Sequence, residues 1–207
     1  MRKIILSVGA ILAFGFANAQ DMGAVKEEMD TAKGMDFEKG NMFIEGGIKI
    51  TTGDTSNDYF AINPKFGYFV NNKLAVGADL DFSSDKSYIN DDKTSTFGVG
   101  LFARYYFLSL AQSRLKAYGE AGVGYSHQKF DPNVGDSDTT NGIKANIDLG
   151  LNYFFTENWA ATFTLANILS YNNANPENGG STNDFELNIN LFENIFATPQ
   201  FGLLYKF

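Results

Sequence analysis

The chain has 207 residues, no cysteine, one histidine, a formal net charge of −8 and a mean hydropathy of −0.18. The lack of cysteine excludes disulfide scaffolds, thiol nucleophiles and cysteine–metal sites. The acidic balance argues against nucleic acid as a partner, because phosphate binding requires a basic surface. The length suits a single domain.

Residues 1–19 have the form of a secretory signal peptide. Arg2 and Lys3 make a basic start, residues 4–16 are apolar, and residues 17–19 (Ala-Asn-Ala) are a small-residue cleavage site. The apolar stretch is too short for a transmembrane anchor, and polar sequence follows it. Its removal changes the formal net charge from −8 to −10, because two basic residues leave with it.

Residues 20–41 are polar and charged and show no strand alternation. We interpret them as a flexible mature N-terminus that precedes the folded domain, residues 42–207. Eight strand-like segments follow, each bounded by Gly, Asn, Asp or Ser turns. They are placed at 42–50, 59–70, 73–83, 95–107, 114–128, 142–155, 157–170 and 197–207. In the sixth, apolar residues such as Ile147 alternate with polar residues such as Asp148, which puts one set on each face of a sheet.

Four of these segments end in an aromatic phrase: residues 66–69 (FGYF), 105–107 (YYF), 153–155 (YFF) and 205–207 (YKF). Aromatic side chains at one fixed end of a strand are typical of a membrane–water interface. Their recurrence on every second strand predicts that these strands run in one direction and end at one depth. We therefore predict an all-β fold, an eight-stranded antiparallel transmembrane up-and-down β-barrel.

The connections alternate between short and longer polar stretches, and short turns face the periplasm in outer-membrane barrels. An even number of strands then puts both termini in the periplasm and the longer loops outside the cell. Residues 184–192 also alternate and resemble a ninth strand, which would break this parity. We interpret them as an extension of the last hairpin or as a loop over the mouth. A ten-stranded barrel with a partner strand in 20–41 is the alternative.

The signal peptide, the alternating segments and the closing FGLLYKF resemble the small outer-membrane β-barrel (porin-like) family, similar to OmpX and the OmpA membrane domain. The resemblance covers residues 42–207 and implies a place in the outer membrane of a Gram-negative-type envelope. It also implies that a C-terminal aromatic on alternating apolar residues is an assembly signal. The positions that match this signal are Phe201, Leu203, Tyr205 and Phe207.

Charges of both signs are predicted to face the barrel lumen. By strand parity they are Glu45, Lys49, Lys65, Asp79, Asp81, Arg104, Lys116, Glu120, Lys144 and Asp148. Eight strands enclose a space just wide enough for side chains to fill, so buried charges must pair. A structural ion-pair core, with Glu120 as the first partner of Arg104, is favoured over an ion pathway or a ligand cavity.

Aromatic side chains near the turns are predicted to form an interface girdle. They are Tyr68, Tyr105, Phe107, Tyr153 and Trp159.

Two features of the sequence are candidates for a catalytic or a metal-binding site. Ser126 and His127 are strand neighbours that point to opposite faces, so they cannot act as nucleophile and base together. The loop at 131–138 is rich in oxygen ligands but lacks the closing glutamate of an EF-hand, and a solvated loop is favoured over a weak cation site. We expect no catalytic, cofactor-binding or metal-binding residues.

The predicted function is a non-enzymatic one, a structural or surface-interaction role through extracellular loops. The alternative is a narrow passive pore or small-ligand carrier, and a lipid-modifying enzyme is the least supported class. The expected partners are outer-membrane lipids, lipopolysaccharide and the barrel-assembly machinery, with an extracellular ligand left open. No nucleic acid is expected, and the protein is predicted to be a monomer.

Overall fold

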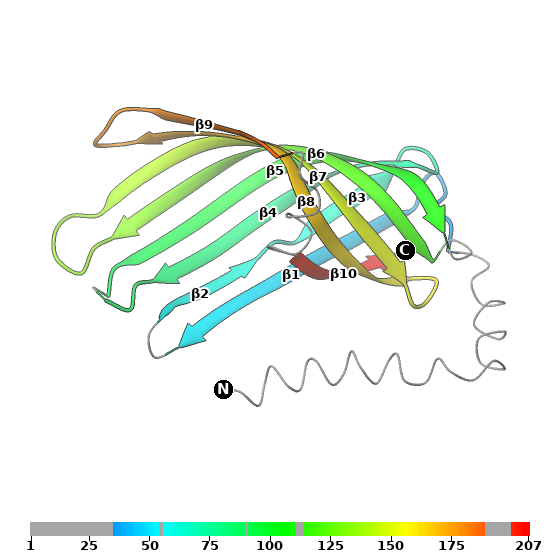
Figure 1. Cartoon of the computed structure of the whole chain (residues 1–207), viewed down its shortest axis with the longest axis horizontal. Helices are drawn as coiled ribbons and strands as arrows, with labels where there is room; N and C mark the ends of the chain where they lie inside the picture. The colour runs from blue at the N-terminus through cyan, green and yellow to red at the C-terminus, as the bar shows by residue number, and fades with distance from the viewer. Residues whose placement is uncertain (1–34, 54–55, 90, 111–113, 189–199) are drawn as a thin grey trace.

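The computed structural model describes residues 35–207 except 54–55, 90, 111–113 and 189–199, so the predicted signal peptide lies outside the described residues. Ten antiparallel strands form one curved sheet (Figure 1). They are β1 (Met42–Gly53), β2 (Ser56–Ile62), β3 (Lys65–Phe69), β4 (Leu74–Lys86), β5 (Lys93–Leu110), β6 (Leu115–Asp131), β7 (Asp138–Phe154), β8 (Trp159–Pro176), β9 (Thr182–Leu187) and β10 (Gln200–Lys206).

The sheet closes on itself through β10, which pairs with β1 on one side and with β8 on the other. β2 and β3 share one position in the wall, since both pair with β1 and with β4. The ring therefore has eight positions, occupied in order by β1, β2 with β3, β4, β5, β6, β7, β8 and β10. The predicted all-β, antiparallel barrel is confirmed.

A proline interrupts the second wall position, which the sequence pattern had predicted as one unbroken strand. Pro64 has no N–H group for the ladder. Asn63 remains bonded to β1 beside the proline, because its Oδ1 accepts a hydrogen bond from the Gly47 amide at 3.2 Å and its own amide donates to the Gly47 carbonyl at 3.3 Å. The Pro64 carbonyl still accepts from the Leu80 amide at 2.9 Å. The wall thus stays hydrogen-bonded around the break.

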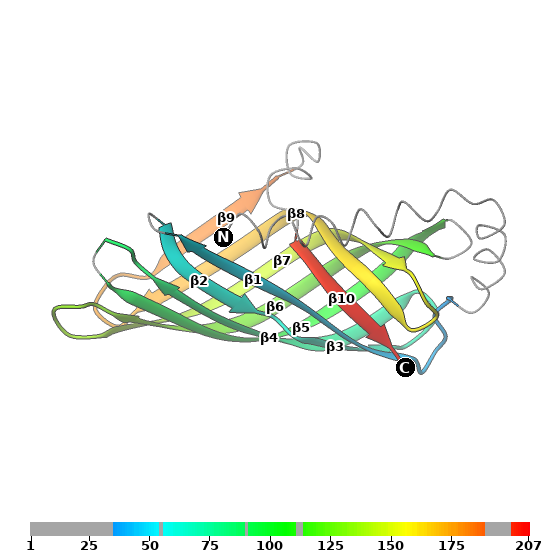
Figure 2. The same cartoon turned by 90° about the horizontal axis from the view of Figure 1, so that it is seen from below.

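β9 lies outside the ring and pairs with β8 from Leu169 to Ala174 (Figures 1 and 2). This agrees with the interpretation of residues 184–192 as an extension of the last hairpin, as far as residue 188. The ten-stranded alternative required a partner strand in 20–41. Of that range the structure describes 35–41, and these residues form no strand.

One end of the barrel carries the start of β1, the end of β10 and the β3–β4 and β7–β8 turns; we call it the terminal end. The opposite end, where β4–β5 and β6–β7 connect, is the hairpin end. Strands there run further than predicted: β7 begins at Asp138 rather than at residue 142, and β8 continues to Pro176. Polar residues extend these hairpins because backbone hydrogen bonds need no apolar alternation.

Along the walls, side chains alternate between a lumen face and an outer face. In β5 every second residue from Gly98 to Tyr106 is buried and the intervening ones are exposed. Large apolar side chains are therefore exposed on the outside, for example Ile48 at 64% and Leu101 at 63%. An exposed apolar band of this kind is the face that a barrel presents to lipid. Among the described residues, no helix is long and apolar enough to cross a membrane.

Candidate functional site: the filled lumen

The middle of the lumen is occupied by one buried guanidinium. Arg104 lies on the inward face of β5 and has no solvent exposure. Its two terminal nitrogens contact Glu45 of β1 at 2.6 and 2.8 Å, and its Nε donates to Glu120 of β6 at 2.7 Å. The ring of Tyr118 lies 4.1 Å from the guanidinium carbon. Arg104 thus joins two carboxylates from different sides of the barrel.

Glu120 also holds a second cation. Lys65 of β3 forms an ion pair with its other oxygen. The four charges of this group (Arg104, Lys65, Glu45 and Glu120) balance, which is what burial in a low-dielectric interior demands. We call these four residues the central ion-pair cluster. It links β1, β3, β5 and β6 across the lumen through oppositely charged groups that face one another, and it leaves no free charge among them to attract an ion.

Nearer the hairpin end, the lumen is polar and more open. Lys144 pairs with Asp81, and both side chains remain about one-third exposed, 36% and 31%. Asp148 accepts a hydrogen bond from Asn167 at 2.7 Å. Asp79 faces Gly100 across the strand pair. These groups form smaller pairs rather than one continuous network.

Two further predicted lumen charges, Lys49 and Lys116, also lie outside the cluster. Lys49 is exposed and its Nζ lies 5.0 Å from the centre of the Tyr59 ring. Lys116 lies at the terminal end, where its Nζ donates to Asp36 at 3.0 Å and to Ser109 at 3.4 Å. Of the ten charges predicted to face the lumen, four therefore make up the central ion-pair cluster and six lie outside it.

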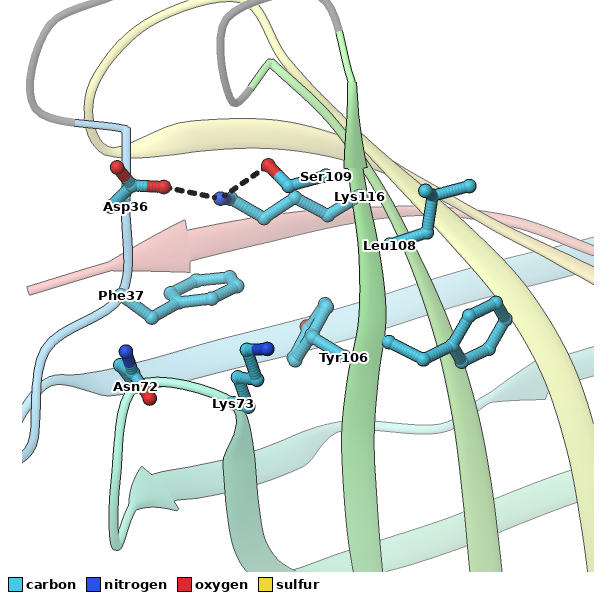
Figure 3. A pocket seen from close by; sticks show the side chains of 9 residues that line it. Asp36, Phe37, Asn72, Lys73, Tyr106, Leu108, Ser109 and Lys116 are labelled. Carbon is cyan, nitrogen blue, oxygen red and sulfur yellow. Dashed lines mark hydrogen bonds and ion pairs between the residues drawn. The ribbon is translucent and has the colours of Figure 1, made fainter.

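Residues that precede β1 lie in the terminal end of the lumen. Met35 and Phe37 are 1% and 3% exposed. The Phe37 ring stacks on Phe69 at a centroid distance of 4.0 Å and lies 4.6 Å from Tyr106. Figure 3 shows Asp36 and Phe37 facing Lys116 and Tyr106 across an open pocket. Residues 20–41 were predicted to be a flexible lead-in. Within that range Met35 and Phe37 are buried, because the aromatic rings at this end of the barrel form a cup around them.

Several uncharged lumen residues were not predicted, because only charged side chains were assigned to the lumen face from the sequence. Tyr106 donates to Asn152 at 2.8 Å, and the hydroxyl of Tyr118 lies 3.4 Å from that of Thr162. Strand parity alone would have placed all four inward. No comparable signal marks Phe37, since its segment has no alternation.

The predicted girdle residues are all on the outer face. Tyr68, Tyr105, Phe107, Tyr153 and Trp159 are between 40% and 52% exposed. The four residues of the predicted C-terminal assembly signal also point outward, as Phe201, Leu203, Tyr205 and Phe207 are exposed. Trp159 and Tyr205 touch, with ring centroids 4.8 Å apart. The interface and assembly roles of these residues stay predictions.

The candidate catalytic and metal-binding groups have other neighbours in the structure. His127 Nδ1 lies 2.8 Å from the side-chain oxygen of Asn141, and Ser126 lies opposite Gly142. In the 131–138 loop, Lys129 and Ser137 donate to Asp131, and these hydrogen bonds lower the pKa of its carboxyl below the ordinary value. Among the described residues, no group of three His, Asp or Glu side chains is arranged to hold a metal ion.

Residues 8–191 match the family model described as Outer membrane protein beta-barrel domain. The chain therefore belongs to this family, and the family places it in the outer membrane. Its members include structural, adhesion and pore proteins. No curated protein matches the chain.

Solved structures of similar fold include the outer membrane protein OprG from Pseudomonas aeruginosa, with a TM-score of 0.53 and 16% identity over 84% of this chain and 98% of that one. Neisserial surface protein A has a TM-score of 0.49 and 19% identity over 81% and 96%. The attachment invasion locus protein Ail of Yersinia pestis has a TM-score of 0.46 and 17% identity over 83% and 100%. At such identities, the likeness to OprG supports the fold alone.

Proposed function

We propose that this protein is a non-enzymatic, occluded outer-membrane barrel that acts as a scaffold for surfaces at its hairpin end. The observation that carries the proposal is the central ion-pair cluster. Arg104 is fully buried at the middle of the lumen, and its carboxylate partners Glu45 and Glu120 are 6% and 3% exposed. A passive pore needs a continuous wet path, and charged groups buried against one another oppose it.

The hairpin end is the surface we propose for interaction outside the cell, with the terminal end in the periplasm. Many side chains there are polar and exposed, and the β8–β9 hairpin carries a set of mutually hydrogen-bonded groups. Asn173 donates to Ser181 at 3.1 Å and to Asn183 at 2.9 Å, and Tyr171 donates to Asn183 at 2.9 Å. These bonds hold the hairpin in a defined shape, which a recognition surface requires.

Single-channel recording in a planar lipid bilayer tests the occluded state. The expected result for the purified protein is the absence of steady steps of uniform conductance. Such steps would overturn the scaffold proposal in favour of the narrow pore or small-ligand carrier. A lipid A mass spectrum from cells with and without the protein tests the enzymatic class, and the two spectra are expected to agree.

Cysteine labelling on intact cells tests the orientation, since the chain has no native cysteine. Val134 at the hairpin end is 87% exposed, and Asn72 lies in an exposed turn at the terminal end. A membrane-impermeant thiol reagent is expected to label Val134→Cys on whole cells and Asn72→Cys only after permeabilisation. The reverse pattern would overturn the proposed orientation and the surface role with it.

A further inference from the structure

The residues just before β1 turn back into the barrel instead of continuing away from it. Gly40 adopts a positive φ of 99°, a conformation that glycine tolerates and that reverses the chain here. Its amide donates to the Phe69 carbonyl at 2.9 Å, and the Asn41 side chain accepts from the Glu38 amide at 2.8 Å. This turn directs Met35 and Phe37 into the terminal end of the lumen and leaves the Asp36 side chain, which is 73% exposed, at its rim.

The cup that receives these residues matches them in both chemistry and shape. Phe37 is enclosed by aromatic rings, including Phe154 at a centroid distance of 5.6 Å. Lys116 and Lys206 lie over the same ring at 5.1 and 5.9 Å. Both lysines also meet Asp36: Lys116 binds its carboxylate, and the Lys206 ammonium donates to its backbone carbonyl at 3.1 Å. A cup of aromatic rings with two ammonium groups is complementary to a peptide that carries an aromatic ring next to a carboxylate, since the rings and cations contact the aromatic side chain and a cation binds the carboxylate.

The backbone hydrogen bonds that close the ring of strands do not involve Met35, Asp36 or Phe37. β1 and β10 close the barrel through the register Phe43–Lys206 to Gly47–Gly202, all of it beyond the turn at Gly40. Met35, Asp36 and Phe37 add no strand to the wall, as residues 35–41 form none. The segment can therefore leave the lumen without opening the barrel.

We propose that Met35–Phe37 is a releasable plug, bound in the terminal end of the lumen as a peptide ligand is bound. The ligand class that the cup takes is a peptide with an aromatic side chain next to a carboxylate, and its resident occupant is the chain's own Asp36–Phe37 pair. The plug and the central ion-pair cluster close the lumen in series. Release of the plug exposes the part of the lumen between the terminal end and the central ion-pair cluster, and it does not open a continuous channel through the barrel.

A cysteine reporter between the two closures tests the plug in the full-length protein. Thr162 is 6% exposed, lies opposite Asn152 and approaches the Tyr118 hydroxyl. Because the chain has no other cysteine, the modification rate of Thr162→Cys by a small cationic thiosulfonate reports access to this level. Ser109→Cys, at the exposed mouth, controls for delivery of the reagent.

Phe37→Ala in the Thr162→Cys background is expected to raise the modification rate at least about tenfold. Asp36→Asn, which keeps the shape and removes the charge, should raise it less. Glu38→Ala is the matched control because the Glu38 side chain is exposed, and it should leave the rate unchanged. A folded heat-shifted band on gels confirms that each barrel is intact. If Thr162→Cys is modified at the same rate with phenylalanine and with alanine at position 37, whether that rate is slow or fast, the plug proposal is overturned.

Rescue in trans tests recognition and is independent of the scaffold proposal. A peptide with the sequence of residues 33–40 is added to the Phe37→Ala/Thr162→Cys protein at several millimolar, about the effective concentration that a short tether provides. It is expected to restore protection, whereas the same peptide with alanine for phenylalanine is not. No protection by the first peptide, or equal protection by both, overturns the recognition. Bilayer conductance of Phe37→Ala should stay absent, because the central ion-pair cluster remains.

Discussion

Removal of the Arg104 side chain should destabilise the barrel more than any other single change in the lumen. Arg104 is fully buried and makes paired contacts of 2.6 and 2.8 Å with Glu45. With alanine at this position, Glu120 keeps Lys65, but Glu45 loses the cation that it binds. Leaving a buried charge without its partner costs about 3–5 kcal/mol, which we expect as the loss in the free energy of unfolding.

A double-mutant cycle separates the ion pair from the loss of packing. Arg104→Met keeps much of the apolar bulk over the Tyr118 ring, and Glu45→Gln keeps the shape of the carboxylate. Residues in direct contact within one network couple by about 0.5–3 kcal/mol, and the bidentate geometry places this pair toward the upper end. The double variant should therefore be more stable than the sum of the two single losses predicts.

Urea unfolding from lipid vesicles, followed by the fluorescence of the single tryptophan, measures these free energies. Gel mobility before and after heating shows whether each variant reaches the folded barrel. A loss below about 1 kcal/mol for Arg104→Ala, the scale of an exposed ion pair, together with no coupling to Glu45, would refute the argument that the cluster is a buried structural core.

Four further predictions concern the outer face, the lumen and the C-terminal residue. Leu101→Arg puts a cation on the lipid face and should lower the free energy of unfolding from vesicles by roughly 2–4 kcal/mol, and an unchanged stability would show that the two faces are assigned the wrong way round. Gly100→Ala should lower it by about 1–3 kcal/mol through crowding, because a Cβ there would lie 2.6 Å from a neighbouring carboxylate oxygen. Lys144→Met breaks the part-exposed pair with Asp81 and should change the stability by only about 0–1 kcal/mol, and a loss as large as that of Arg104→Ala would show that burial does not rank these pairs. Deletion of Phe207 should cost about 1.5–3 kcal/mol in refolded protein but slow assembly in cells far more, and normal assembly in both settings would argue against an assembly signal at this C-terminus.

Much of the wall could be predicted because the relevant information is local. Side chains on a strand alternate with a period of two, so Leu101 could be assigned outward and Arg104 inward without knowledge of the partner strands. The pairing of Arg104 with Glu120 could also be anticipated, since neighbouring strands of an up-and-down barrel lie side by side. The contact of Arg104 with Glu45 could not, because it depends on how the ring closes.

Other features were predicted incompletely for identifiable reasons. The strand predicted at residues 59–70 contains Pro64, a signal for a break that the alternation of its neighbours obscured. Strand lengths at the hairpin end were underestimated because polar residues such as Asp138 and Asn173 offer no apolar period there. Backbone pairing, which is independent of side-chain polarity, decides their structure.

The sequence by itself determined the barrel class, the alternation of faces along the strands and the outer placement of the girdle residues, because each of these rests on a repeat of two residues. Only the tertiary structure decided which lumen charges meet and that Phe37 is buried. Those contacts join residues far apart in the chain, and they exist only once the closed ring has brought the aromatic rings and cations of several strands to one level. Burial, rather than residue type, then separates the central ion-pair cluster from the solvated pairs near the hairpin end.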